Sequence, residues 1–488
     1  MNRRAIGVAL LLISAATSAG AADLLSVYQD ALRNDPQLRE ADALRRASRE
    51  VRPQAWSNML PQITGSAAWT KGDTDQTQNQ AQSLVQNGQP VGTILVPRTT
   101  EFRPDTRQWS FDLRQNLFSW SNFATIRAAN HQVAQAEADY RTAQQLLMQR
   151  VAQRYFAVLA AQDTLEAQQA ALEAFNRQLD QANKRFEVGL IAITDVQDTK
   201  AARDQSAAAV IAAKRALATA EEQLREITAQ KYERLSRPTA EMPLQPPQPE
   251  IEEEWVNVSM DQNPQLLSAR FAADVARENV RIAFGGHLPT LDLVGAYGKT
   301  EGHGTARFSN FDAETGTNLL GPTTDFPTEA NTKTYGLQIQ IPIFSGGLVN
   351  SRTREQEFRW IAAKERVTLT SRQTERAARD AYLGVISEMA RVEALKQALE
   401  SNRTSLSATE AGYEVGTRTS VDVLDARRLL VQAQTDFARS RYDYLQNVIN
   451  LRFAAGNLDQ ETLAELNRLL TETVPTAPTQ PNAPPPAQ

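Results

Sequence analysis

The chain of 488 residues has no cysteine, only three histidines and no run of five or more Lys or Arg residues. Without cysteine it forms no disulfide, and it lacks the residue that carries the lipid of a bacterial lipoprotein. His131, His287 and His303 form no metal-binding spacing such as HExxH, so we expect no metal site and no cofactor. The mixed charge, formally −5, offers no basic surface and argues against nucleic acid as a partner.

Long hydrophobic runs are also missing. The first 22 residues have Arg3 and Arg4, then an apolar stretch, then small residues before Asp23, which is the layout of a cleaved secretory signal peptide at 1–22. Beyond them no run of 18 or more apolar residues occurs, so no transmembrane helix is expected. An exported chain of this kind is either soluble or a β-barrel.

The sequence indicates a tandem duplication, because four motifs recur in the same order at offsets of 226 to 228 residues. We expect repeats at 23–235 and 251–470, a Pro-rich linker at 236–250 and a disordered Pro-rich tail at 471–488. The paired motifs are NDPQL and NPQL around Pro36 and Pro264, LPQI and LPTL at Leu60 and Leu288, WSFDLRQNLFS and YGLQIQIPIFS at Trp109 and Tyr335, and FEVGLIAITDVQD and YEVGTRTSVDVLD at Phe186 and Tyr413.

Each repeat begins with a helix broken at Pro36 or Pro264, followed by two segments in which apolar and polar residues alternate. A period of two over about ten residues predicts strands long enough to cross a bilayer when tilted, although a soluble β-sandwich fits the strands alone equally well. The polar connectors between them, 72–106 and 301–332, are expected to be long loops outside the cell. The predicted strands are 61–71, 107–118, 289–300 and 333–344.

Apolar residues recur every seven positions after each strand pair, which predicts long coiled-coil helix pairs at about 122–235 and 346–455. The 72 residues from Leu117 to Gly189 would reach about 100 Å as a helix. The heptad residues are Val151, Val158, Leu165, Leu172, Leu179 and Phe186; Val196, Val210, Leu217 and Leu224; Val385, Val392, Leu399, Leu406 and Tyr413; and Val423, Leu430, Phe437, Tyr444 and Leu451.

Four strands per chain cannot close a barrel, and open strand edges leave backbone groups unsatisfied in lipid. If the strands cross a membrane, the chain must therefore oligomerise. Two copies would supply about 8 strands and a filled interior, and three would supply about 12 and a usable bore.

The duplication, the strand pairs and the turn motifs VGLIAITDVQ and VGTRTSVDVLDA resemble those of the TolC-type outer-membrane efflux proteins, from Asp23 to about Leu470. The resemblance implies a mainly α protein with a membrane β-barrel. Long coiled-coil hairpins would form an α-barrel, and four strands per protomer would complete a 12-stranded barrel in a homotrimer. It implies a location in the outer membrane, in contact with its lipid, with a periplasmic extension.

The resemblance also implies a passive channel-tunnel that exports drugs, small molecules or proteins, as in type I secretion. An inner-membrane efflux pump or ABC exporter and a periplasmic adaptor protein would dock at the far end, which closes like an iris. The alternatives are a self-contained porin, an outer-membrane enzyme or a periplasmic coiled-coil scaffold. An enzyme would need a nucleophile and base that the sequence does not offer, and GxSxG is absent.

The duplicated turn motif is expected at the tip of each helix pair. Gly189 and Gly416 would end a helix in the left-handed conformation, which glycine adopts without strain. The next helix would begin with a capping box at Thr194 and Gln197, and with a looser version at Thr419.

The acids after each turn have two readings. Asp195 and Asp422 lie in first helical turns, where a carboxylate contributes about 0.3–1 kcal/mol. Asp422 and Asp425 also share a helix face, so three copies would place six carboxylates around the entrance. Such a ring favours cations, and mutual repulsion should raise some of its pKa values. The resemblance supports the ring at these two positions.

By the same resemblance, Tyr413 and Asp195 would be hydrogen-bonded between neighbouring helix pairs, and Arg418 would contact Thr194 or its surroundings. These four residues would form a latch that holds the entrance shut. A charge-assisted bond is strong enough for this and weak enough for a docking partner to break. A solvated helix face accounts for Asp198, to which no role is assigned.

Overall fold

The computed structural model describes residues 21–86, 89–239, 241–312 and 317–475, so the predicted signal peptide lies outside it up to position 20. The chain forms two compact units, each assembled from separate segments. The first comprises Met1–Arg46, Ala134–Arg270 and Glu365–Gln488, and the second Ala47–Val133 and Phe271–Lys364.

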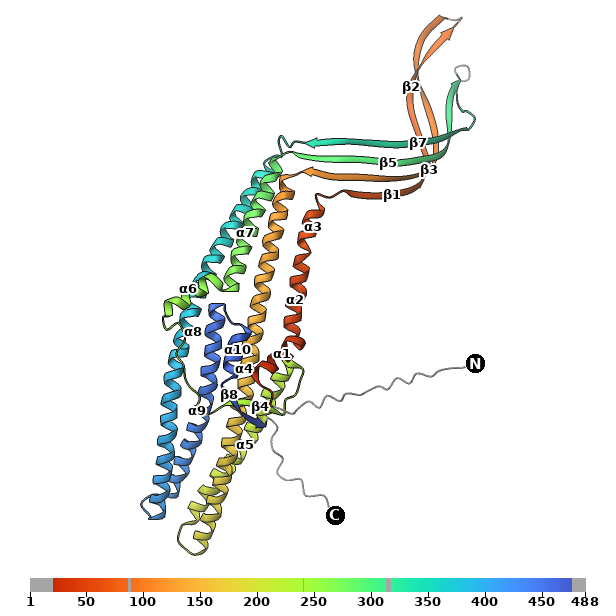
Figure 1. The fold of residues 1–488 in the computed structure, drawn as a ribbon. Coiled ribbons are helices and arrows are strands. Elements are labelled where there is room, and N and C mark those ends of the chain that lie inside the picture. Colours follow the sequence, from red (N-terminus) through yellow and green to blue (C-terminus); the bar gives the residue numbers. More distant parts are fainter. Residues whose placement is uncertain (1–20, 87–88, 240, 313–316, 476–488) are drawn as a thin grey trace, which may run out of the picture. The chain divides into compact units, whose positions relative to one another are not determined.

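Two long helix pairs dominate the first unit (Figure 1). Helices α4 (Trp120–Glu187) and α5 (Ile193–Thr228) form hairpin 1, and helices α8 (Leu348–Glu414) and α9 (Ser420–Ala455) form hairpin 2. Helices α4 and α8 begin in the second unit and end in the first. The long helix pairs that the heptads predict are therefore present, and each ends within eight residues of its expected limits.

The heptad residues supply the core of the hairpins, because they lie on one stripe of each helix. Val151, Val158 and Leu165 have exposed fractions of 1% or less. Towards the tips the burial declines, and Phe186 is 41% exposed. The other buried heptad residues are Val196, Val210, Leu217, Leu224, Val385, Val392, Leu399, Leu406, Val423, Phe437, Tyr444 and Leu451.

Shorter helices precede each strand group, and they break at the predicted prolines. Proline has no N–H to donate within a helix, so Pro36 and Pro264 each become the first residue of a new one. The side chains before them accept from that new helix: Asp35 from the Leu38 N–H at 2.9 Å, and Asn263 from the Leu266 N–H at 3.3 Å. These helices are α1 (Leu24–Asn34), α2 (Pro36–Arg49), α3 (Val51–Ser57), α6 (Glu252–Gln262) and α7 (Pro264–Phe284), the last continuing into a 3-10 turn (Gly285–His287).

A small ribbon in the first unit corrects two predicted boundaries. Strands β4 (Arg234–Pro238) and β8 (Leu470–Pro475) pair antiparallel, after the short helix α10 (Gln460–Asn467). The first residues of the expected linker and of the expected disordered tail are therefore strands. Prolines in both segments suggested irregular structure, but here they lie at strand ends, where a missing N–H is tolerated. The tail beyond Pro475 lies outside the described residues.

The second unit contains one antiparallel sheet in which β3 and β5 are central, flanked by β1 and β7 (Figure 1). All four predicted strands are present, although the last ends at Gln340 and not at 344. The prediction of long loops was wrong, because β3, β5 and β7 continue into the connectors. The strands are β1 (Gln62–Lys71), β2 (Thr74–Gln86), β3 (Gln89–Phe118), β5 (Thr290–Asp312), β6 (Thr317–Leu320) and β7 (Thr324–Gln340).

The sheet has one apolar and one polar face, and both are largely exposed. Directly paired residues point to the same side, so the register sorts the side chains. The pairs Ile63–Leu113 and Leu293–Leu337 lie on the apolar face, and the pair Ser66–Ser110 lies on the polar face. Also on the apolar face are Trp109, Phe111, Tyr297, Tyr335 and Ile339; on the polar face are Thr64, Asp112, Arg114, Asp292, Thr334 and Gln338.

The two outer strands of this sheet have open edges. Within the described residues β1 pairs only with β3, and β7 pairs only with β5. Each therefore carries a row of backbone groups without a strand partner among the described residues. Among the described helices, none is both long and apolar enough to span a membrane.

Candidate functional site

The tips of the hairpins carry the predicted glycines in the predicted conformation. Gly189 has φ +76° and Gly416 has φ +79°, both left-handed. At the first tip the Leu190 N–H donates to the Arg185 carbonyl at 2.9 Å, and at the second the Thr417 N–H donates to the Gly412 carbonyl at 2.8 Å. This pattern closes a helix with a Schellman motif, so each turn has a defined backbone geometry.

At the first tip, the helix that follows the turn does not begin at the predicted residue. Thr194 lies inside α5, because that helix starts at Ile193 with Ala192 before it. Asp195 supplies the cap, and its carboxylate accepts from the Ala192 N–H at 3.3 Å. The capping box at Thr194 and Gln197 was therefore wrong by two residues. Asp and Thr are both good first-turn residues, and the sequence alone did not separate them.

The second tip has the complete capping box. The Asp422 N–H donates to the Thr419 hydroxyl oxygen at 3.2 Å, and the Asp422 carboxylate accepts from the Thr419 N–H at 2.8 Å. The bond from the Thr419 N–H and a second bond from the Thr419 hydroxyl to the same carboxylate, with the nearby Arg418 charge, hold the pKa of Asp422 below its usual range. One turn further on, Asp425 is ion-paired with Arg428 at 2.9 Å. Within one protomer both acids of the predicted ring therefore have polar partners.

The predicted latch residues lie at these tips, each close to its own turn. The Arg418 side chain lies against Gly412, and Thr194 is exposed. The ring of Tyr413 contacts hairpin 1 through Arg185, whose guanidinium carbon lies 4.9 Å from the ring centroid. Arg185 was not singled out in the sequence, because an arginine near a helix end is common. The bond from Tyr413 to Asp195 and the contact of Arg418 with Thr194 stay predictions.

A second contact joins the hairpins farther from the tips. Phe175 of α4 is 4% exposed and packs with Ala171, Ala202 and Leu424. The guanidinium of Arg427 in α9 lies 6.0 Å from the Phe175 ring centroid. Arg427 also forms an ion pair with Glu410 of α8.

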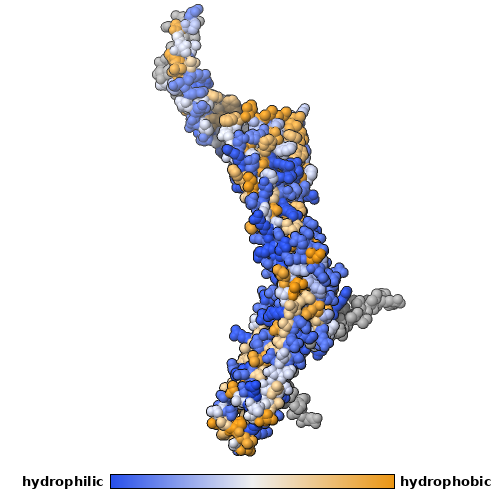
Figure 2. All heavy atoms as spheres, turned by 90° about the vertical axis from the view of Figure 1, so that its left-hand side faces the viewer, coloured by the Kyte–Doolittle hydropathy of each residue, from blue (hydrophilic) through white to orange (hydrophobic). Residues whose placement is uncertain are grey.

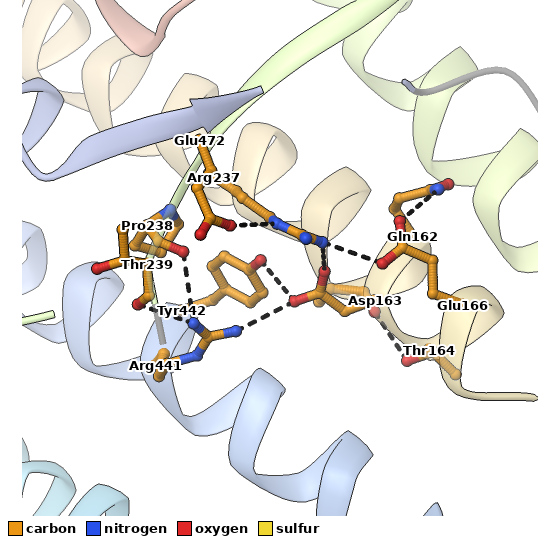
Figure 3. A network of polar contacts seen from close by, with 11 residues as sticks. Gln162, Asp163, Thr164, Glu166, Arg237, Pro238, Thr239, Arg441, Tyr442 and Glu472 are labelled. Carbon is orange, nitrogen blue, oxygen red and sulfur yellow. Dashed lines mark hydrogen bonds and ion pairs between the residues drawn. The ribbon is translucent and has the colours of Figure 1, made fainter. Parts of the chain in front are cut away.

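A buried polar network ties the hairpins to the β4–β8 ribbon (Figure 3). The Asp163 carboxylate of α4 accepts from Arg237 of β4 at 2.9 Å and from the Tyr442 hydroxyl of α9 at 2.7 Å. Arg441 lies 3.4 Å from the same carboxylate, and Arg237 also bonds Glu472 of β8 at 3.0 Å. Burial raises the pKa of Asp163 and that of Tyr442. Its members come from four elements, so no local sequence pattern could have identified it.

Comparison with known proteins identifies the family. The sequence model described as "Outer membrane efflux protein" matches residues 27–230 and 255–457, which together are most of the chain. The chain belongs to the outer membrane efflux protein family. This match confirms the resemblance to outer-membrane efflux proteins that the turn motifs indicated. It also confirms the outer-membrane location and the efflux or secretion function that the resemblance implied. Members of this family are channels, so the protein is not an enzyme.

Named relatives in this family match over almost their whole length. Outer membrane protein TolC of Vibrio cholerae is 34% identical over 447 residues, 92% of this chain and 93% of the relative. Outer membrane protein TolC of Escherichia coli is 34% identical over 458 residues, covering 94% and 87%. The alkaline protease secretion protein AprF of Pseudomonas aeruginosa is 27% identical over 459 residues, covering 94% and 89%.

Two solved structures of outer membrane proteins share the fold. VceC from Vibrio cholerae superposes with a TM-score of 0.66 at 19% identity, covering 89% of this chain and 96% of its own. The Campylobacter jejuni CmeC outer membrane channel gives a TM-score of 0.68 at 18% identity, covering 92% and 90%. A mainly helical fold with antiparallel strands is thus common to all three.

In the part of the chain that the structure describes, no group of three or more His, Asp or Glu side chains is placed to hold a metal ion. The described side chains at the tips form turns, caps and contacts between the hairpins.

Proposed function

We propose that three copies of this chain form a channel-tunnel that crosses the outer membrane and extends into the periplasm. Each copy contributes β1, β3, β5 and β7 to a 12-stranded barrel, and the hairpins form an α-barrel that continues the pore. Docked to an inner-membrane transporter and a periplasmic adaptor protein, it exports drugs, small molecules or proteins.

The sheet is the observation that carries this proposal. One face is apolar and exposed, as contact with lipid requires, and the other is polar, as a water-filled lumen requires. In hydrocarbon the open edges of β1 and β7 must find partners. Pairing β1 of one copy with β7 of the next satisfies both edges and closes the ring.

The two matches to the family model support the tandem duplication. They cover 27–230 and 255–457 and fall within the proposed repeats 23–235 and 251–470. In each repeat a broken helix leads to two main strands and then to a long hairpin. With two similar repeats in each copy, a ring of three copies has nearly sixfold symmetry. Such symmetry suits a barrel of evenly spaced strands.

The names of the relatives support export as the task. AprF and the Dickeya chrysanthemi protein PrtF are named as protease secretion proteins, and the Brucella suis protein BepC as an efflux protein. An adaptor could dock on the apolar side chains at the tips, where Val188, Leu190 and Val415 are 69%, 74% and 76% exposed. Figure 2 shows hydrophobic side chains at this end of the first unit.

At the tips, Asp422 and Asp425 of three copies form the acidic ring of the entrance, and Thr194, Asp195, Tyr413 and Arg418 form its latch. The shared helix face of the two acids supports the ring, and the position of all six residues at or next to the turns supports both proposals. A self-contained porin is not favoured, because it would need all its strands in one chain.

Cross-linking and the native mass of detergent-extracted protein test the assembly. We expect a mass of three chains, and cation-conducting pores when the protein is added to planar bilayers. A stable monomer that still conducts would overturn the proposal.

A further inference from the structure

The side chains of Arg185 and Tyr413 join the two hairpins at their tips. Arg185 lies in the last turn of α4 and Tyr413 in the last turn of α8. The guanidinium carbon of Arg185 lies 4.9 Å from the centroid of the Tyr413 ring. At this distance the cation is attracted by the negative face of the ring.

Both residues are held in place by the backbone of the turns. The Arg185 carbonyl accepts from the Leu190 N–H at 2.9 Å, and the Tyr413 carbonyl accepts from the Gly416 N–H at 3.2 Å. Each turn therefore fixes the main chain of one partner. Both side chains are partly buried, whereas the neighbouring Lys184 is exposed.

The contact at Phe175 lies about 15 Å farther along α4, ten residues from Arg185. There Phe175 is buried against apolar side chains, and Arg427 is only 17% exposed and ion-paired with Glu410. The deeper contact excludes water and combines an ion pair with apolar packing, so it is the stronger of the two. Hairpin tips that move apart would break the Arg185 contact first and pivot at Phe175.

We propose that Arg185 is a positioning residue of the closed entrance, holding Tyr413 through its ring face, with Phe175 and Arg427 as the pivot below. The inference rests on the proposed channel-tunnel. It differs from the latch in the group of Tyr413 that is used, because the latch needs the hydroxyl and this contact needs the ring.

The strength of the contact suits an entrance that a docking partner opens. Even with the small energy of an exposed site, a cation–π contact changes the ratio of closed to open forms by about twofold to fivefold per copy. In a ring of three the product is about tenfold to a hundredfold. Such a bias keeps the resting pore closed and yields to a partner that binds the open form better.

The first test is R185A in the full-length trimer, with K184A as the matched control. Both variants remove one positive charge from the same helix end, but only Arg185 contacts Tyr413. We expect mean conductance in planar bilayers to rise severalfold for R185A and to stay at the native value for K184A. R185K keeps a cation within reach of the ring and should restore most of the native conductance.

The second test separates the ring of Tyr413 from its hydroxyl. Y413F keeps the face on which Arg185 lies and loses only the hydroxyl that the latch uses, whereas Y413L loses both. Y413L should therefore conduct at least as much as R185A and clearly more than Y413F. The double variant R185A/Y413L should conduct no more than Y413L alone, because Y413L already removes the contact that R185A removes.

Native conductance in R185A would overturn the proposal, and equal opening in Y413F and Y413L would assign the closure to the hydroxyl instead. Native mass confirms that each variant is still trimeric before its conductance is read. A native protein that is monomeric or forms no pores would sink the channel-tunnel itself, an outcome visible before any variant is made.

Discussion

At the scale of residues, the two acids of the proposed entrance ring have polar partners that their spacing in the sequence did not indicate. Asp422 accepts two bonds from Thr419, and Asp425 is paired with Arg428. The six carboxylates of a trimer would therefore act as a ring whose charge is partly compensated. The lowered pKa of Asp422 keeps it ionised when the pH falls into the range where an ordinary aspartate begins to protonate.

Replacing both acids by asparagine, D422N/D425N, should lower the cation selectivity of the pore. Asparagine keeps the shape and the capping oxygen, so charge is the main change. Reversal potentials under a salt gradient measure the effect, and D198N on an exposed helix face is the control. Unchanged selectivity in D422N/D425N would show that the acids do not face the lumen.

Single residues were predictable where one local rule decides. Gly189 and Gly416 were found because a left-handed helix end strongly favours glycine. Thr194 was misplaced because two good capping residues stand side by side in the sequence. Arg185 was missed because its partner is 228 residues away, and nothing in the spacing of the chain brings the two together.

At the scale of elements, the Asp163 network fastens the ribbon to both hairpins. Arg237 bonds Asp163 and Glu472, and Arg441 is 8% exposed with Asp163 as its carboxylate partner. Removing the acid would leave that buried cation unpaired, at a cost of about 3–5 kcal/mol. We therefore expect D163N to lower the thermal midpoint at pH 7, while D180N on an exposed stretch of α4 leaves it unchanged.

Helices and strands could be predicted where their sequence pattern is local, and they were missed where the deciding contacts are distant in sequence. Heptads over many turns identified α4, α5, α8 and α9, since most heptad residues are buried for the same reason. The strand extensions were missed, because a connector such as β2, rich in Gln and Thr, has no apolar alternation to read. Strands β4 and β8 were missed because their pairing spans more than 230 residues.

At the scale of the whole molecule, the two faces of the sheet decide where the protein can reside. Leu337 lies on the apolar face and Gln338 on the polar face, so these adjacent residues are on opposite sides of the sheet. A lysine on the lipid side costs about 2–4 kcal/mol at the middle of the bilayer, and one on the lumen side costs little. We expect L337K to reduce the amount of trimer in the outer membrane sharply, and Q338K to leave it near the native level. Native mass and membrane fractionation measure both, and equal losses would mean that the faces are not lipid and lumen.

The open edges of β1 and β7 have a genetic consequence. In the proposed ring every copy must offer two edge strands that can pair with its neighbours. A mutation that prevents one edge strand from pairing therefore disables the neighbouring copies as well. When half of the chains in a cell carry such a defect, only about one ring in eight is built from intact chains alone. A mutant allele of this kind would therefore be dominant over the wild-type allele, in contrast to ordinary loss-of-function alleles of monomeric proteins.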